Sequence, residues 1–209
     1  MTRKAVLFDF GGVITRPMSE MFAPAVAESG VDGTAMLPAM LAVFASEDDT
    51  DTIPHRAERG EVPHADLLAW ADEQAPGAGL MLDPDSPHFF GGRLQLHDDM
   101  PGVVDDIRSR GMKTAIVSNM FEAWQPAVDR VFTYRDRFDT LLWSWEVGLR
   151  KPNPAIFELA LERLGVAAHE AVYLDDFPAM AEGARAVGID AIDVGDHDKA
   201  IAHLYEALA

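Results

Sequence analysis

The stretch AVLFDFGGVIT, residues 5–15, joins a short apolar run to one aspartate and a pair of glycines. Ala5–Phe8 is continuously apolar rather than alternating, which predicts a strand buried on both faces. Asp9 follows at once, and in open α/β sheets ligands bind beyond the carboxyl ends of the strands. Gly11 and Gly12 allow backbone N–H groups to turn toward an anion. The stretch therefore predicts the first strand of a parallel sheet with a binding site at its end.

Apolar runs and helical patterns alternate through the second half of the chain. The runs predicted as strands are Thr114–Val117, Leu141–Trp143, Ala171–Leu174 and Ala191–Val194. Helical spacing occupies residues 101–111, 153–165 and 178–188. In the second of these helices we expect Asn153 as the N-cap, Pro154 at the first helical position and Gly165 at the end. This alternation predicts an α/β protein with a doubly wound, Rossmann-like parallel sheet.

Residues 16–91 differ because they show helical spacing and no convincing strand. The helical stretches are SEMFAPAVAESG (19–30), PAMLAVFA (38–45) and HADLLAWADEQA (64–75), with Met36, Leu37, Met40, Leu41 and Phe44 at helical spacing in the second region. Residues 75–92 are rich in Pro and Gly and predict a connection back to the sheet. We therefore expect an α/β core of residues 1–15 and 92–209, with residues 16–91 inserted as a helical module. Helical spacing favours packing within that module over a pocket-lining role for Met36, Met40, Phe44 and Trp70.

The composition is that of a globular protein with an acidic surface. The 209 residues are 48% hydrophobic and 25% charged, and 17 Lys and Arg against 35 Asp and Glu give a net charge of −18. That charge disfavours nucleic acid and anionic membranes as partners, since both need a basic surface. The chain has no cysteine, which excludes disulfides and thiolate chemistry. No stretch approaches the roughly 18 apolar residues of a membrane span. We expect a cytoplasmic protein, and the sequence leaves its oligomeric state open.

Polar side chains suited to phosphate and divalent-metal chemistry follow the predicted strands. They are Asp9 after the first, Ser118 and Asn119 after the second, Lys151 shortly after the third, and Asp175 and Asp176 after the fourth. Three carboxylates at one sheet edge would repel one another unless a cation joined them, and oxygen ligands favour Mg²⁺. A serine hydroxyl and a lysine ammonium suit a phosphoryl group. Each residue alone is more typical of a turn or a helix cap, but their order after four successive strands favours a shared site.

Four motifs in this order resemble those of the haloacid dehalogenase superfamily of aspartate-nucleophile hydrolases. The matching stretches are VLFDFGGVI, TAIVSN, EVGLRKPNPAIF, and AVYLDD followed by GARAVGI. The helical insertion after the first motif is similar to the small helical cap of the family. The sequence is most similar to the phosphatase-like subgroup that includes the N-terminal domain of mammalian soluble epoxide hydrolase. The resemblance covers nearly the whole chain and implies the family's Rossmann-like fold with an inserted cap.

The resemblance implies a role for each polar residue at the sheet edge. Asp9 is the expected nucleophile, which becomes an aspartyl phosphate, and Lys151 is the second expected catalytic residue. Phosphoryl oxygens would be held by Ser118, Lys151, the Asn119 backbone N–H and the backbone of Phe10 and Gly11. Mg²⁺ would be held by Asp9, the Gly11 carbonyl and Asp176, with Asp175 acting partly through water. The implied reaction is hydrolysis of the phosphate monoester of a small metabolite.

Gly11 departs from the pattern of the family's phosphatases, in which a second aspartate at this position protonates the leaving oxygen. General acid–base catalysis contributes about 10²–10⁴-fold, so three consequences stay open. The enzyme acts on good leaving groups, or a cap residue such as His55, Glu58 or His64 supplies the proton, or the protein is a weak or inactive phosphate-binding, regulatory member. The sequence ERGE (58–61) itself reads as a turn between cap helices.

Two other chemistries of the superfamily fit the sequence less well. Dehalogenases usually lack the acid pair that Asp175 and Asp176 form here. Phosphonate cleavage uses a cap lysine, and residues 16–91 contain none. The leading prediction is therefore a Mg²⁺-dependent phosphatase for a small phosphorylated metabolite. A phosphate-binding protein is the second reading, and a halide-releasing hydrolase is the third.

Overall fold

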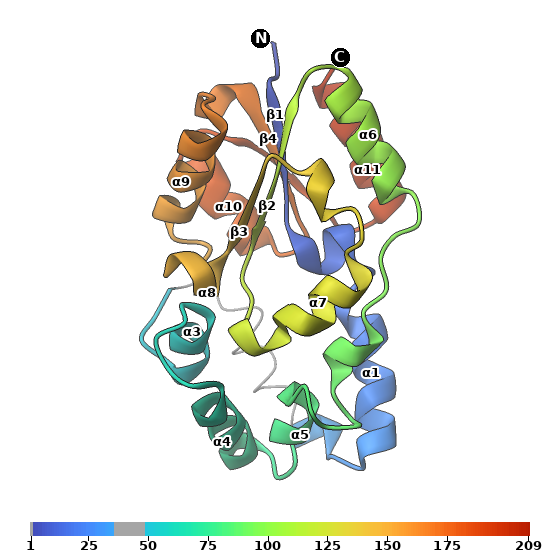
Figure 1. The fold of residues 1–209 in the computed structure, drawn as a ribbon, viewed down its shortest axis with the longest axis vertical. Coiled ribbons are helices and arrows are strands. Elements are labelled where there is room, and N and C mark those ends of the chain that lie inside the picture. Colours follow the sequence, from blue (N-terminus) through green and yellow to red (C-terminus); the bar gives the residue numbers. More distant parts are fainter. Residues whose placement is uncertain (1, 36–48) are drawn as a thin grey trace.

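A five-stranded, fully parallel sheet forms the centre of the molecule (Figure 1). The computed structural model describes residues 2–35 and 49–209. The strands are β1 (Ala5–Phe8), β2 (Lys113–Ser118), β3 (Thr140–Trp143), β4 (Ala171–Asp175) and β5 (Asp190–Asp193). Their order across the sheet is β3-β2-β1-β4-β5, which places β1 in the middle. The predicted α/β fold is confirmed, and all five predicted strands are present.

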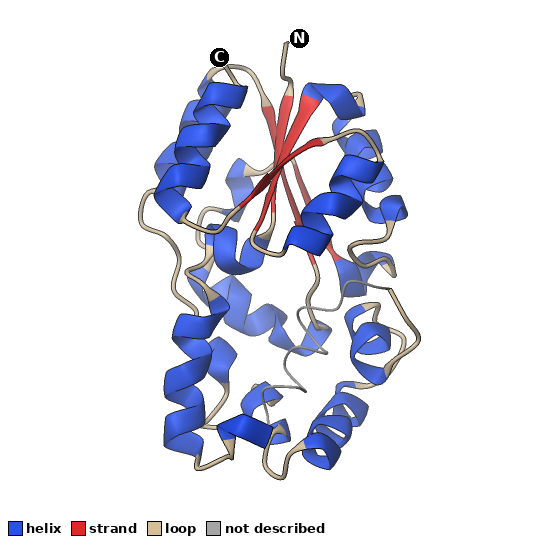
Figure 2. Cartoon of the chain, turned by 180° about the vertical axis from the view of Figure 1, so that it is seen from behind, coloured by secondary structure: helices blue, strands red, loops and turns tan. Residues whose placement is uncertain are grey.

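Helices cover both faces of the sheet, which explains why the strands are continuously apolar (Figures 1 and 2). One face packs against α6 (Met100–Ser109) and α11 (His197–Ala207), and the other against α9 (Pro154–Leu164) and α10 (Pro178–Ala186). Alternate residues of β1 serve the two cores: Val6 and Phe8 on the α6 side, Ala5 and Leu7 on the α9 side.

The local signals at helix α9 act as the sequence predicts. The Asn153 side chain accepts a hydrogen bond from the Ala155 N–H at 3.0 Å, so it caps the first turn. Pro154 opens the helix, and Gly165 ends it with a left-handed φ of 64°. The helix therefore begins immediately after the loop that carries Lys151, and its cap helps to fix that loop.

A second group of helices lies beyond the carboxyl ends of the strands (Figure 1). It comprises α1 (Met18–Ser29), α3 (Ile53–Glu58), α4 (His64–Gln74) and α5 (Gly79–Leu82). The predicted connection at residues 75–92 contains helix α5 and most of a 3₁₀ turn at Phe90–Arg93, so part of it is regular structure. The predicted helical residues Met36, Leu37, Met40, Leu41 and Phe44 lie outside the described residues. Trp70 packs against the main hydrophobic cluster. We refer to residues 16–91 as the cap, with the boundaries proposed from the sequence.

The two chain segments that join the sheet to the cap run side by side. Thr15 and Leu96 form an isolated antiparallel bridge. The Arg16 N–H donates to the Gln95 carbonyl at 2.8 Å, and the His97 N–H donates to the Ile14 carbonyl at 3.0 Å. The chain thus leaves the sheet region and returns to it at neighbouring points.

Several connecting elements complete the described structure. They are α7 (Gln125–Val131), α8 (Ser144–Val147) and short 3₁₀ turns at Glu122–Trp124, Arg135–Arg137 and Ala168–Glu170. Residues Phe10–Ile14, directly after β1, form a tight turn in which Gly12 has a φ of 71°. Within the part of the chain that the structure describes, no helix has both the length and the apolar character of a membrane span.

Candidate active site

Asp9 lies at the carboxyl end of β1, in the middle of the sheet, and its side chain is nearly buried. The Lys151 Nζ atom is 2.9 Å from Asp9 Oδ1, and the Phe10 N–H donates to the same oxygen at 2.7 Å. Burial raises the pKa of Asp9 from 3.8 to about 6, although the Lys151 ammonium opposes the rise. The nucleophile predicted from the sequence is therefore a carboxylate held beside one buried cation.

Lys151 is positioned by the end of strand β2. The Asn119 side chain forms two hydrogen bonds with the Lys151 backbone: Nδ2 donates to the carbonyl at 3.0 Å and Oδ1 accepts from the N–H at 2.8 Å. Ser118, also nearly buried, is the last residue of β2. These contacts bring together three residues that the sequence placed after two different strands. Because the Asn119 side chain is bound to the loop that carries Lys151, its backbone N–H is the group expected to contact an anion.

The Lys151 ammonium also connects Asp9 to Asp175. Its Nζ atom donates to Asp175 Oδ2 at 2.7 Å and to the Tyr173 hydroxyl at 2.8 Å. Burial alone would lower the pKa of Lys151, but the Asp175 and Asp9 carboxylates raise it above its ordinary value. Lys151 is therefore a fixed positive charge at the sheet edge.

Tyr173 is a site residue that the sequence analysis missed. It lies inside the apolar run of β4, where its size and position predict only packing. Its hydroxyl donates to Asp175 Oδ2, so it orients the same carboxylate oxygen that Lys151 contacts. The other Asp175 oxygen, Oδ1, accepts from the Phe177 N–H at 2.8 Å. Both oxygens of Asp175 thus have partners within the protein, which supports an indirect role at a metal.

Asp9, Asp175 and Asp176 form a compact acidic group. One carboxylate oxygen from each residue lies within 4.8 Å of the others. Asp176 Oδ1 is buried without a hydrogen-bond partner. Burial, together with the charges of Asp9 and Asp175, raises the pKa of Asp176 from 3.8 to about 8. An unpartnered buried oxygen among three carboxylates is the environment that a hard divalent cation stabilises. The donor set fits Mg²⁺, as the sequence predicts.

Gly12 permits the close approach of Asp176 to the turn after β1. A Cβ atom at Gly12 would lie 2.1 Å from Asp176 Oδ2, and the φ of 71° also favours glycine. Gly11 is different, because among the described residues a Cβ there would meet the Met18 side chain alone, at 3.8 Å, which is an ordinary contact. Space for a side chain therefore exists at the position where related phosphatases carry their acid.

A cavity lies over this edge of the sheet, beneath the cap. Its polar lining includes Asp9, Ser118, Asn119, Lys151 and, from the cap, Glu58. Much of the remaining lining is apolar and includes Phe89, Phe90 and Trp124, whose rings pack edge to face. The other two cap residues named from the sequence, His55 and His64, do not belong to this lining among the described residues. Apart from Glu58, the polar groups lie on the sheet side of the cavity and the aromatic rings offer an apolar wall, a combination that suits an organic group attached to a phosphate.

Comparison with known proteins assigns the chain to a family. Residues 3–188 match the model of the haloacid dehalogenase-like hydrolases. Because this match spans most of the chain, the protein belongs to that family and is a hydrolase. The family resemblance predicted from the four sequence motifs is confirmed.

Three curated relatives illustrate the match. The mouse haloacid dehalogenase-like hydrolase domain-containing protein 3 is 40% identical over 144 residues, which cover 66% of this chain and 52% of the relative. The ribulose-1,5-bisphosphate 5-phosphatase of Halopiger xanaduensis is 31% identical over 118 residues, covering 56% and 49%. Mouse acyl-CoA dehydrogenase family member 10 is 35% identical over 114 residues, covering 52% and 10%. The matched segments thus span about half or less of these relatives' lengths.

A solved structure supports the fold. The enzyme bt-2542 of Bacteroides thetaiotaomicron, in a complex with magnesium and inorganic phosphate, superposes with a TM-score of 0.69. The alignment covers 97% of this chain and 98% of that chain at 19% sequence identity. At this identity the likeness shows a shared haloacid dehalogenase fold.

Proposed function

We propose that this hydrolase is a Mg²⁺-dependent phosphatase that acts on a small phosphorylated metabolite. The observation that carries the proposal is the Asp9 carboxylate 2.9 Å from the Lys151 ammonium, within a group of three carboxylates. A nucleophilic carboxylate, a fixed cation and a metal-binding acidic group are the components that phosphoryl transfer requires. The names of the relatives agree, since a ribulose-1,5-bisphosphate phosphatase, a pyrimidine nucleotidase and a phosphoserine phosphatase are among them.

In the proposed reaction, an oxygen of Asp9 attacks the phosphorus atom and the bond to the leaving oxygen breaks. Lys151, the Ser118 hydroxyl and the Asn119 N–H bind the phosphoryl oxygens, with the backbone of Phe10 and Gly11 beside them. This step yields an aspartyl phosphate on Asp9 and an alcohol or phenol. Water then attacks the same phosphorus, which releases inorganic phosphate and restores the carboxylate. Division into two displacements lowers the barrier of a difficult hydrolysis.

The chain offers a consistent ligand set for the metal. Asp9, the Gly11 carbonyl and Asp176 would hold Mg²⁺ directly, and Asp175 would act through water because its own oxygens already have partners. A bound Mg²⁺ would neutralise charge on the phosphoryl group and on the carboxylates around it. Asp175, Tyr173 and Asn119 would keep Lys151 in place.

A phosphate-binding protein with little turnover is the second candidate. Gly11 favours it, because the residue that assists the leaving group in related phosphatases is absent. Halide release is a weaker candidate, since such chemistry has no need of the acid pair Asp175 and Asp176. A cytoplasmic location stays a prediction from composition.

Hydrolysis of para-nitrophenyl phosphate tests the leading proposal. Wild-type protein and Asp9→Asn are compared in Mg²⁺ and in EDTA. We expect activity only in the wild type with Mg²⁺, together with an acid-stable, hydroxylamine-sensitive phosphoprotein that Asp9→Asn lacks. Folded wild-type protein that binds phosphate and Mg²⁺ without turnover would favour the second candidate. Equal activity in Asp9→Asn would show that Asp9 is not the nucleophile.

A further inference from the structure

Glu58 is an acidic side chain that the cap contributes to the active-site cavity. It is the last residue of α3, and only 2% of its surface is exposed. It lines the same cavity as Asp9, Ser118 and Lys151. A buried carboxyl group that lines a cavity beside the proposed nucleophile is a candidate for chemistry.

One core residue, Arg150, fixes Glu58 relative to the nucleophile. Glu58 Oε2 accepts a hydrogen bond from Arg150 Nε at 2.7 Å, and Arg150 is fully buried. Arg150 directly precedes Lys151, whose ammonium contacts Asp9. The cap carboxyl and the catalytic lysine are therefore positioned by adjacent residues of one loop.

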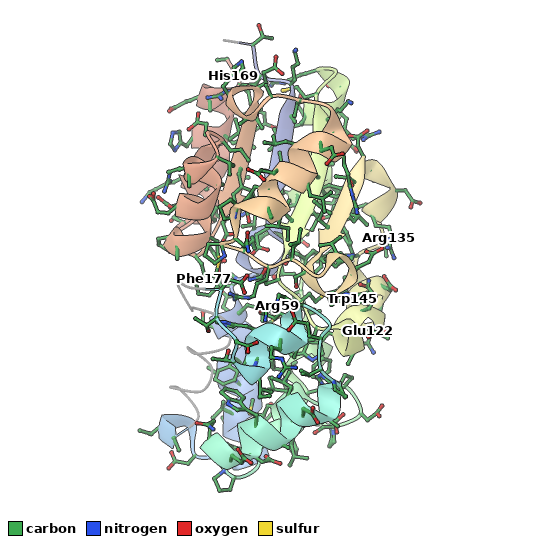
Figure 3. All side chains as sticks on the ribbon, turned by 90° about the vertical axis from the view of Figure 1, so that its left-hand side faces the viewer. Arg59, Glu122, Arg135, Trp145, His169 and Phe177 are labelled. Carbon is green, nitrogen blue, oxygen red and sulfur yellow. The ribbon has the colours of Figure 1, made fainter. Side chains whose placement is uncertain are left out.

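A wider set of contacts joins this part of the cap to the core. Asp49 forms an ion pair with Arg59, and its second oxygen accepts from Asn153 Nδ2 at 3.2 Å. Arg59 lies at the end of α3, next to the core segment that carries Trp145 (Figure 3). These contacts hold the end of α3 against the loop before α9, so Glu58 has a defined place over the sheet edge.

Opposing influences act on the charge of Glu58. Burial raises the pKa of Glu58 above its ordinary value, and the charges of Arg150 and Lys151 counter part of the rise. The carboxylate of Asp49, on the cap side, adds to it. A carboxyl group shifted toward neutrality can both donate and accept a proton, which is what acid–base catalysis needs.

The two histidines of the cap are placed differently. His55 Nδ1 accepts from the Thr50 N–H at 3.0 Å, and the His64 ring lies 3.1 Å from the Leu82 carbonyl. Both of these hydrogen bonds lie within the cap. Of the three cap residues that the sequence left open as proton donors, Glu58 is the one in the cavity lining.

We propose that Glu58 performs the proton transfers that Gly11 cannot, an inference that rests on the proposed phosphatase function. In the first step, Asp9 attacks phosphorus, the bond from phosphorus to the leaving oxygen breaks, and the Glu58 carboxyl proton passes to that oxygen. In the second step, the Glu58 carboxylate takes a proton from water as the water oxygen bonds to phosphorus and the Asp9 oxygen is released. The cycle returns Glu58 to its protonated form.

The test compares leaving groups in the Mg²⁺-loaded enzyme. Glu58→Gln keeps the shape of the side chain and an oxygen for Arg150 but carries no transferable proton. Its kcat/KM is measured with phenyl phosphate, a poor leaving group, and with para-nitrophenyl phosphate, a good one. Glu61→Gln is the matched control, because Glu61 is exposed and pairs with Arg59.

We expect Glu58→Gln to lose about 10²–10⁴-fold with phenyl phosphate and less than about tenfold with para-nitrophenyl phosphate. Glu61→Gln should keep the wild-type ratio. An equal loss on both substrates, or no loss, would overturn the assignment of Glu58 while leaving the phosphatase function intact. A wild type that hydrolyses neither ester would overturn both proposals.

Gly11→Asp gives a second test that does not disturb the Arg150 contact. If Glu58→Gln lacks only a proton donor, a carboxyl at position 11 should restore phenyl phosphate hydrolysis to that variant. If Glu58→Gln does not fold, Glu58→Asp, which keeps a carboxylate for Arg150 on a shorter side chain, is compared with the wild type on the two esters. A loss confined to phenyl phosphate would support the role of Glu58, and an equal loss on both esters, or no loss, would overturn it.

Discussion

Asp176 should destabilise the metal-free protein, and Asp176→Asn should relieve that penalty. The pKa of Asp176 rises from 3.8 to about 8 because of burial and the nearby charges of Asp9 and Asp175. At about pH 7 the folded protein therefore keeps a proton that the unfolded chain has lost. From the ordinary pKa of 3.8 up to about pH 7, this difference in proton binding lowers the free energy of unfolding by about 4 kcal/mol, at about 1.36 kcal/mol per pH unit.

The sign of the pH dependence follows from proton binding. Between about pH 4 and pH 8 the folded state binds more protons than the unfolded state, so the free energy of unfolding falls as the pH rises. In EDTA at about pH 7, Asp176→Asn should exceed the wild type in stability by up to about 4 kcal/mol. For a chain of this length each kcal/mol moves the melting temperature by about 2–4 °C. Near pH 4 the advantage should disappear.

Magnesium should narrow the difference in stability between the two proteins. A ligand at 100 times its dissociation constant stabilises the folded state by about 2.7 kcal/mol, and only the wild type retains the full carboxylate group. Urea unfolding with and without Mg²⁺, at several pH values, measures both effects. Asp136→Asn, at an exposed aspartate, is the control and should change little. If Asp176→Asn is the less stable protein in EDTA at neutral pH, the reasoning about the acidic group is wrong.

Three further changes probe the same edge of the sheet. Lys151→Met leaves the buried carboxylates of Asp9 and Asp175 without their cation, so urea unfolding in EDTA should show a loss of about 3–5 kcal/mol; an unchanged midpoint would contradict the burial of this charge group. Gly12→Ala should weaken Mg²⁺ binding, measured by calorimetry, at least about tenfold, since strain at this site costs about 1–3 kcal/mol. Gly11→Ala is the control and should bind Mg²⁺ as the wild type does. Similar Mg²⁺ affinities in the two variants would exclude the close approach of Asp176 to Gly12. Tyr173→Phe should lower stability by about 1–2 kcal/mol and reduce kcat, and a fully active variant would remove Tyr173 from the site.

The sheet could be predicted from the sequence because burial on both faces leaves a continuous apolar signal. β1 has the predicted bounds, and the other strands differ from prediction by one residue at one or both ends. Those terminal residues, such as Lys113 and Thr140, are polar or partly exposed, so they extend the backbone pairing without extending the apolar run. Helix α11 was not defined beforehand, although the Asp196 side chain caps it by accepting from the Lys199 N–H at 3.0 Å.

The residues after the strands could be predicted because the topology brings strand ends together. The pairing of Glu58 with Arg150 could not be predicted, since these residues are 92 positions apart and lie in separate parts of the chain. ERGE reads as a turn from its sequence, and the turn is present, but its first residue faces the cavity. The role of Tyr173 could not be predicted either, because its ring fits the apolar pattern of β4. Only the structure shows that its hydroxyl contacts Asp175.

The bridge between Thr15 and Leu96 has a consequence for how such an enzyme could change its substrate. The segment that leaves the sheet and the segment that returns to it are hydrogen-bonded to each other at this bridge. The inserted residues therefore form a loop whose two ends are held together. Such an insertion can be exchanged or lengthened at a small entropic penalty to the rest of the chain. The proposed nucleophile, Lys151 and the acidic group stay at the sheet edge, while Glu58 and the residues that would select the organic group arrive with the inserted segment. Recombination at this one junction could therefore supply a new pocket, together with its own proton donor, to an unchanged nucleophile and metal site.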